Sequence, residues 1–317
     1  MIIVTGAAGF IGSIFVQTLN ERGYQDIVLV DDFGREDKKQ NWEGLTFKEK
    51  VHRDALLDWI PGKELLIQAI VHLGARTDTT EQDWALFERL NLNYSKALWE
   101  IATTHQIPFI YASSAATYGD GSRGFDDDES QMPALEALNP YGRSKLEFDT
   151  WVLGQEKKPF FWAGLKFFNV YGPHEDHKGR MASVVYHAFQ QIQQTSKMKL
   201  FRSHKPEWEN GKQQRDFVFV KDVADVLVWL LEHRTRSGIY NLGTGNSRTF
   251  LDLVLAVFKS LNCSPEIHFI DIPEDIRDTY QYFTEANMAK LADAGYDRPF
   301  TSLEDGIDDY VKSWLLK

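Results

Sequence analysis

Tyr141 and Lys145 have the side-chain types and the spacing needed to move a proton to or from an alcohol. A spacing of four residues puts both side chains on one face of a helix. A free phenol has a pKa of about 10, so holding it near 7 means favouring the phenolate by about 4 kcal/mol. A nearby ammonium and the positive ring of an oxidised hydride acceptor can supply this stabilisation of the phenolate in a site that excludes water. A Tyr and a Lys at this spacing are common by chance, so the surrounding motifs decide whether the pair is catalytic.

That context begins with three glycines near the start of the chain: Gly6, Gly9 and Gly12. They follow a β-rich run, Ile2–Val4, and open a helical stretch. Glycines there permit a tight turn and close approach of the backbone to a pyrophosphate, and the helix N-terminus offers free N–H groups. The GxxGxxG spacing differs by one residue from the commonest GxGxxG pattern. We therefore expect a dinucleotide to bind at this turn.

Two carboxylates, Asp31 and Asp32, end the second predicted strand. A carboxylate about 20 residues after the glycines normally accepts hydrogen bonds from the adenosine ribose, which favours NAD. Basic residues close by could instead neutralise the 2′-phosphate of NADP: Arg35, Lys38, Lys39 and Arg53. Ordinary surface charge explains them equally well, so the residues leave NADP and NAD both open.

The elements around these residues alternate between strand and helix. Short apolar runs predict buried strands at Met1–Thr5, Asp26–Val30, Ala69–Leu73, Pro108–Ser113 and Phe160–Phe168. Helical spacing marks Phe10–Arg22 and Trp84–Thr104, and Asn139-Pro140 is a good start for the helix that carries Tyr141. The alternation predicts an α/β fold, a doubly wound parallel sheet of the Rossmann type with a smaller C-terminal α/β substrate domain.

The chain becomes more irregular after Asn169. We expect helices at Met181–Gln194 and Val223–His233 and from Leu251 and Leu303, and strands at Phe217–Val220, Ile239–Leu242 and Ile267–Ile270. Residues 1–168 and about 216–240 are assigned to a dinucleotide-binding domain. Residues 169–215 and 241–317 are assigned to a substrate-binding domain.

Composition excludes several classes of function. The net charge of −11 over 317 residues, with no basic stretch, argues against nucleic-acid binding. No run approaches the roughly 20 apolar residues that span a bilayer. Cys263 is the only cysteine, which excludes an intrachain disulfide and fits a reducing cytoplasm. We expect a cytoplasmic enzyme with no metal site.

The stretch Ser113–Gly119 ends a predicted strand. Together with the glycines and the Tyr141/Lys145 pair, it resembles the extended short-chain dehydrogenases, in which a Ser, a Tyr and a Lys act together on a sugar hydroxyl. The resemblance implies that Ser114 orients the hydroxyl and that Tyr141 is the acid and base. It also implies that Lys145 contacts the cofactor ribose and activates Tyr141, and that Asn91 is a structural residue near the cofactor.

A longer match narrows the family. The segments that carry it are Phe168–Pro173, His177–Gly179, Met181–Val184, His187, Arg215–Val218, Asn241–Gly245 and Tyr280-Gln281. Ser113–Gly119 supports it, and with the earlier motifs the resemblance covers nearly the whole chain. They resemble the ADP-L-glycero-D-manno-heptose 6-epimerases, nucleotide-sugar epimerases that serve lipopolysaccharide biosynthesis. The HKGxMASV piece is the specific part, whereas FNVYGP and NLGTG are shared by many nucleotide-sugar enzymes.

This resemblance implies an isomerase that oxidises C6″ of ADP-D-glycero-β-D-manno-heptose with NADP and reduces the transient ketone on its other face. The scheme needs an acid/base group on each side of the carbon, and it implies Tyr141 for one and Lys178 for the other. A lysine base needs its pKa, about 10.4 when free, lowered by desolvation or nearby cations. His177 and Arg180 flank Lys178 and could contribute. By residue type alone, a surface loop residue or a phosphate contact is the favoured interpretation of Lys178.

The resemblance also implies the remaining contacts. Those with the cofactor are Gly6, Gly9, Phe10, Ile11, Gly12, Asp31, Asp32, Lys38, Arg53, Leu73, Gly74, Ala75, Asn91, Lys145 and Val170. Those with the ADP-heptose substrate are Ser114, Asn169, Lys178, Arg180, His187, Phe201, Arg215 and Tyr280. Arg215 would face the diphosphate, because a planar guanidinium binds phosphate oxygens well. Without the resemblance, packing in the core or on the surface would explain His187 and Tyr280. A homo-oligomer, with a five-membered ring as one form, is also implied.

Two features depart from the family pattern. Arg180 stands where a small residue is expected beside the sugar, and the stretch Arg202–Gln214 is longer than expected.

Two alternative functions remain. A related nucleotide-sugar 4-epimerase or reductase would use Ser114, Tyr141 and Lys145 without needing Lys178. A non-catalytic cofactor-binding protein would have no use for the Tyr141/Lys145 pair. A 4,6-dehydratase is disfavoured because Ala115–Thr117 offers no carboxylate.

Overall fold

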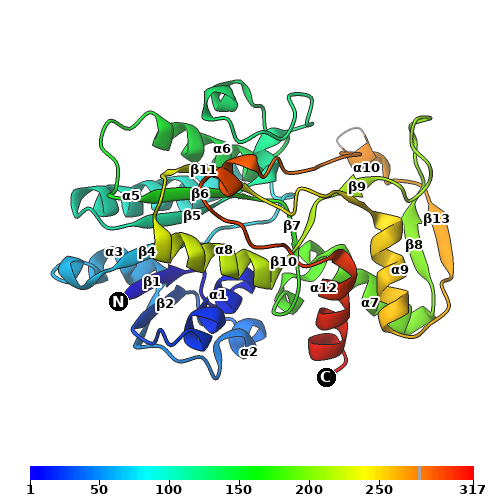
Figure 1. Ribbon diagram of the computed structural model, residues 1–317, viewed down its shortest axis with the longest axis horizontal. Coiled ribbons are helices and arrows are strands. Elements are labelled where there is room, and N and C mark those ends of the chain that lie inside the picture. The colour runs from blue at the N-terminus through cyan, green and yellow to red at the C-terminus, as the bar shows by residue number, and fades with distance from the viewer. Residues whose placement is uncertain (278–279) are drawn as a thin grey trace.

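Seven parallel strands form the central sheet of the computed structural model, which describes residues 1–277 and 280–317 (Figure 1). Their order across the sheet is β11-β6-β5-β4-β1-β2-β3. The strands are β1 (Ile2–Thr5), β2 (Ile27–Asp31), β3 (Glu49–His52), β4 (Ala69–His72), β5 (Phe109–Ser114), β6 (Trp162–Phe167) and β11 (Gly238–Leu242). The order reverses beside β1, and in open α/β sheets ligands bind at such a point, beyond the carboxyl ends of the strands.

Helices cover both faces of this sheet. Helices α1 (Phe10–Glu21) and α8 (Val220–His233) pack on one face, and α5 (Tyr94–Thr104) and α6 (Pro140–Leu153) pack on the other (Figure 1). Ile2 and Val4 of β1 belong to the first core, whereas Ile3 belongs to the second. Because both faces are covered, every residue of β1, β2, β4 and β5 is buried, and these strands do not alternate between buried and exposed positions.

A second, smaller region lies beside the sheet and consists of paired short strands with three helices (Figure 1). The pairs are β7 (Asn169–Tyr171) with β10 (Phe217–Phe219), β8 (Met198–Phe201) with β13 (Ile267–Ile270), and β9 (Gln214–Arg215) with β12 (Arg248–Thr249). The helices are α7 (Val184–Thr195), α9 (Phe250–Ser260) and α12 (Leu303–Tyr310). The expected fold class is confirmed; the proposed domain boundaries stay a prediction.

Most of the expected elements form, with three differences. The helix expected over 84–104 is divided into α4 (Trp84–Phe87), a π-helical turn (Glu88–Asn93) and α5. The helix expected from Met181 begins at Val184, because Ser183 caps it by accepting the N–H of Tyr186 and Gly179 before it has a φ of 54°. The edge strand β3 was not expected at all. The remaining helices are α2 (Lys39–Trp42), α3 (Leu56–Trp59), α10 (Glu274–Arg277) and α11 (Ala289–Asp293).

Within the part of the chain that the structure describes, the helices are too short or too polar for any of them to cross a bilayer.

Candidate active site

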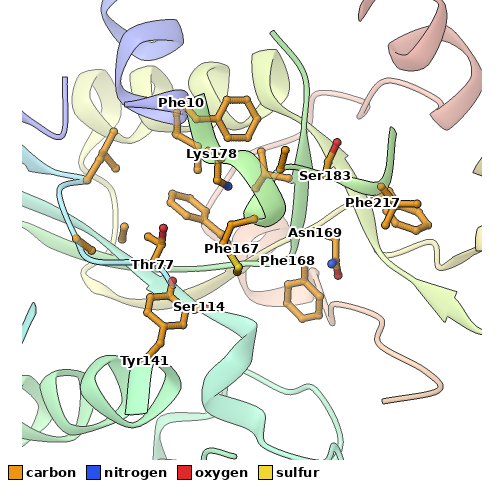
Figure 2. Close-up of a pocket in the computed structure, with 18 of the residues that line it drawn as sticks. Phe10, Thr77, Ser114, Tyr141, Phe167, Phe168, Asn169, Lys178, Ser183 and Phe217 are labelled. Carbon is orange, nitrogen blue, oxygen red and sulfur yellow. The ribbon is translucent and has the colours of Figure 1, made fainter. Parts of the chain in front are cut away.

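A cavity of about 300 Å³ lies at the carboxyl ends of β4, β5 and β6, between the glycine turn and the start of α7 (Figure 2). It brings together ten of the residues expected to bind or react: Phe10, Ile11, Leu73, Ala75, Ser114, Tyr141, Lys145, Asn169, Val170 and Lys178. They come from segments far apart in the sequence, so the meeting of these side chains is a property of the fold. We call this cavity the central pocket.

Tyr141 enters the central pocket from the first turn of α6. The Asn139 side chain accepts the N–H of Gly142 at 2.8 Å, and Pro140 occupies the first turn, as the sequence predicted. Desolvation raises the pKa of Tyr141 above its usual value, while a hydrogen bond with the Ser114 side chain lowers it in part. Figure 2 shows the oxygens of these two side chains close together, so Ser114 is placed to orient a hydroxyl that Tyr141 also reaches.

Lys145 lies one helical turn after Tyr141 and is almost completely buried. Its Nζ donates to the carbonyl of Ala112 at 2.8 Å, and burial lowers its pKa to about 8. Desolvation is the largest influence on the pKa of Tyr141 in this arrangement, and the activation of Tyr141 by Lys145 stays a prediction. An oxidised cofactor, when bound, would add positive charge that favours the phenolate.

Lys178 points into the central pocket from a short turn between β7 and α7, opposite Tyr141 (Figure 2). Its Nζ lies 5.1 Å from the centre of the Phe10 ring. Burial lowers the pKa of Lys178, and the nearby Glu175 raises it. Desolvation, one of the two causes expected from the sequence, is the one that acts here. The side chain of Arg180, expected as a possible contributing cation, turns away to Asp78 and Thr80.

The glycine turn fits a dinucleotide for steric reasons. Gly6 has a φ of 70°, and a Cβ on it would lie 2.7 Å from the backbone nitrogen of Gly74. A Cβ on Gly12 would lie 2.1 Å from the carbonyl oxygen of Gly6. The turn therefore has no room for a side chain at Gly6 or Gly12. Its backbone amides lie close to the N-terminus of α1, where a phosphate is stabilised.

The expected ribose-binding residues gather at the end of β2. Asp31 accepts the N–H of Ala8 at 2.9 Å and the ammonium of Lys38 at 3.0 Å. Arg53 lies 3.9 Å from Asp32 in the neighbouring loop. Two cations therefore stand next to the two carboxylates, and Asp31 already accepts hydrogen bonds from two protein groups.

Like the residues of the glycine turn and of the end of β2, three further expected residues lie outside the lining of the central pocket. Asn91 is buried and bonds to both backbone groups of Arg76 and to the Ser144 hydroxyl, which ties the loop after β4 to α6. Arg180 is exposed and forms the contacts with Asp78 described above. His187 is exposed on α7, with its ring 3.4 Å from the carbonyl oxygen of Arg180.

The other expected substrate residues form a separate cluster. The guanidinium carbon of Arg215 lies 5.4 Å from the centre of the Tyr280 ring, and the Phe201 and Tyr280 rings are 5.9 Å apart. Arg215 is almost fully buried, with hydrogen bonds to the carbonyls of Gln214 and Gln281. An arginine held between aromatic rings can bind a phosphate and a base at one place.

Several residues that line the central pocket were not expected there as site residues. They are Thr77, Ala112, Ser113, Phe167, Phe168, Met181, Ala182, Ser183, Val184, Val185, Phe217 and Leu253. Most are apolar residues that look like core, and a signal came only from the segments that carry the resemblance, which include Ser113, Phe168, Met181–Val184 and Phe217. The aromatic walls keep water from the reacting groups, which strengthens electrostatic interactions there.

Comparisons with known proteins agree with this geometry. The sequence matches the NAD dependent epimerase/dehydratase family over residues 2–243. It is 46% identical to the ADP-L-glycero-D-manno-heptose-6-epimerase of Fusobacterium nucleatum, over 100% of this chain and 98% of that protein.

Two solved structures have the same fold. The Helicobacter pylori ADP-L-glycero-D-manno-heptose-6-epimerase superimposes with a TM-score of 0.83 at 28% identity, over 98% of this chain and 95% of that one. The Thermus thermophilus UDP-glucose 4-epimerase, solved as a complex with NAD, superimposes with a TM-score of 0.77 at 26% identity. The match covers 98% of this chain and 97% of that one.

Proposed function

Because the chain belongs to the NAD dependent epimerase/dehydratase family and, within it, to the ADP-L-glycero-D-manno-heptose-6-epimerases, we propose that it inverts C6″ of ADP-D-glycero-β-D-manno-heptose. The observation that carries this proposal is the position of Tyr141 and Lys178 on opposite sides of one pocket (Figure 2). A 4-epimerase would have no use for Lys178 there. The two-base scheme proposed for inversion at C6″ needs one acid/base group on each face of the carbon, and Lys178 supplies the second.

When bound, a nicotinamide dinucleotide supplies the acceptor and donor of the hydride. On one face of the carbon, Tyr141 exchanges the hydroxyl proton while Ser114 orients the oxygen. On the other face, Lys178 exchanges the proton after the sugar has turned. Phe167, Phe168 and Phe10 exclude water from the transient ketone. The cluster of Phe201, Arg215 and Tyr280 is placed to hold the nucleotide end of the substrate.

The cofactor is a nicotinamide dinucleotide, as the family description states, and we propose NADP. Support comes from Lys38 and Arg53, which stand next to Asp31 and Asp32 and can bind a 2′-phosphate. Mass spectrometry of the cofactor released on denaturation tests this directly. NADP should be found, and in a Lys38→Ala protein the affinity for NADP should fall more than that for NAD.

The decisive test of the activity is to incubate the protein with ADP-D-glycero-β-D-manno-heptose and follow the configuration at C6″ by NMR. The two epimers should approach equilibrium without net consumption of cofactor, because the hydride is returned. No change at C6″, with change at another carbon of a nucleotide sugar, would contradict the proposal. The expected homo-oligomer and the cytoplasmic location stay predictions, and light scattering of the purified protein tests the former.

A further inference from the structure

The turn that carries Lys178 is closed at its base by one buried carboxylate. Glu175 has no solvent exposure. Its Oε1 accepts the N–H of Gly172 at 3.3 Å and the hydroxyl of Ser183 at 2.7 Å, and its Oε2 accepts the N–H of Ser183. The two ends of the segment 172–183 are thereby held together by a single side chain. We call this segment the Lys178 loop.

Several buried contacts hold the first half of the Lys178 loop. The His174 ring lies 2.8 Å from the Ser13 hydroxyl and packs on Trp314, whose indole N–H donates to Asp176. The Asn41 amide donates to the carbonyl of His174 at 3.2 Å. These contacts fix the chain before Lys178 against the glycine turn and the C-terminal segment.

The second half of the loop returns from Lys178 to Ser183 with weaker support. Gly179 has a φ of 54°, and a Cβ there would meet no atom within 4 Å. Arg180 pairs with Asp78, but its side chain is 67% exposed, and exposed pairs contribute little stability. The bonds from Glu175 to Ser183 are buried and charge-assisted, so they are the stronger restraint on the return of the chain.

Glu175 is also electrostatically suited to Lys178. Its negative charge raises the pKa of Lys178 against the effect of burial, so the ammonium tolerates its dry position. The two groups are not in an ion pair, since Glu175 is occupied by Ser183 and Gly172. The amine therefore remains free to point into the central pocket.

We propose that Glu175 is the positioning residue for Lys178, holding the loop closed so that the amine projects into the central pocket opposite Tyr141. This inference rests on the proposed function for its catalytic consequence, but its structural part does not. Without the carboxylate, Ser183 loses its partner, the loop opens after Gly179, and Lys178 reaches solvent.

Two variants and a matched control test this. Glu175→Ala removes the clamp, and Glu175→Gln weakens it while keeping the volume, in case the first fails to fold. Asp222→Asn is the control, because Asp222 likewise accepts a backbone N–H and a hydroxyl, both from Thr301 at 2.8 Å, and neither residue lines the central pocket. The first readout is the rate at which an amine-reactive acetylating reagent labels Lys178, followed by peptide mass spectrometry. The second is the split between kcat and KM for epimerisation.

In both Glu175 variants, labelling of Lys178 should rise severalfold, more for Ala than for Gln. kcat should fall by about 100-fold for Ala, as for other displacements of a reacting group by about 1 Å, while KM and bound cofactor stay nearly unchanged. Asp222→Asn should alter neither readout. Unchanged labelling of Lys178 in the Glu175 variants, or a fall in kcat equal to that of the control, would overturn the inference. If the wild-type protein does not act on the heptose, the proposed function fails, and the labelling still decides the role of Glu175.

Discussion

Lys166 donates to Asp149 across 2.9 Å, and neither side chain has any solvent exposure. Asp149, on α6, also accepts the hydroxyls of Ser113 at 2.6 Å and Tyr111 at 3.0 Å on β5. Lys166, on β6, donates to Thr117 at 2.6 Å. This buried network joins the helix that carries Tyr141 and Lys145 to the two strands beneath the central pocket.

Replacing Lys166 by Met should lower the free energy of unfolding by about 3–5 kcal/mol, because it leaves the Asp149 carboxylate buried without its counter-charge. Urea denaturation measures the loss. Arg143→Met breaks an exposed pair with Glu147 on the same helix and should cost less than about 1 kcal/mol. Equal losses in the two variants would mean that the buried pair has no special role.

Tyr141→Phe removes only the hydroxyl and should reduce epimerisation by about 10²–10⁴-fold, the range for loss of an acid/base group. Cofactor should remain bound, since the glycine turn is untouched. Steady-state assay and cofactor content after gel filtration are the measurements. Tyr24→Phe, on the surface beside Glu232, serves as the control and should keep full activity. Activity within a few fold of wild type in Tyr141→Phe would exclude the phenol as the proton-transfer group.

Lys178→Met keeps the length and apolar contacts of the side chain but removes the amine. Epimerisation should be abolished while the cofactor stays bound, because Lys178 would exchange the proton on the face opposite Tyr141. The protein should still catalyse hydride exchange with one epimer, through Tyr141. Full epimerase turnover in this variant would rule out two acid/base groups. Lys199→Met, with an exposed side chain on β8, is the control.

His72 makes the stability of the fold depend on pH. It is buried between the hydroxyls of Thr5 and Ser95, at 2.6 and 2.8 Å, and burial lowers its pKa to about 3. Between this value and the unfolded value of about 6.5, the unfolded chain binds one more proton than the folded one. Stability from this group is therefore full above about pH 6.5 and falls by about 1.4 kcal/mol for each unit below it.

His72→Gln should consequently reduce the loss of unfolding free energy between pH 6.5 and 5 by about 2 kcal/mol. Urea denaturation at both pH values measures this difference. His268→Gln, at an exposed position on β13, should leave it as in the wild type. If the pH dependence of His72→Gln equals that of the wild type, His72 is not the group that titrates.

Local signals accounted for most of the secondary structure. The apolar runs predicted β1, β2, β4, β5, β6 and β11, and the Asn139 cap formed as expected, because strand burial and capping depend on nearby residues. The edge strand β3 was missed, since only Val51 in it is buried and its partner β2 supplies the hydrogen bonds. Glu175 was missed because an acidic residue in a polar loop is usually solvated.

The sequence by itself determined the chemical groups and their order: a bare turn for a dinucleotide, then a Ser, a Tyr and a Lys, then a second Lys in a polar loop. Only the tertiary structure decided which of these groups meet and in what environment. It put Tyr141 and Lys178 on opposite sides of one cavity, turned Arg180 outward and buried Glu175. The physical reason is that distances across a sheet and the loss of water around a charge depend on the packing of distant segments, which no local pattern records.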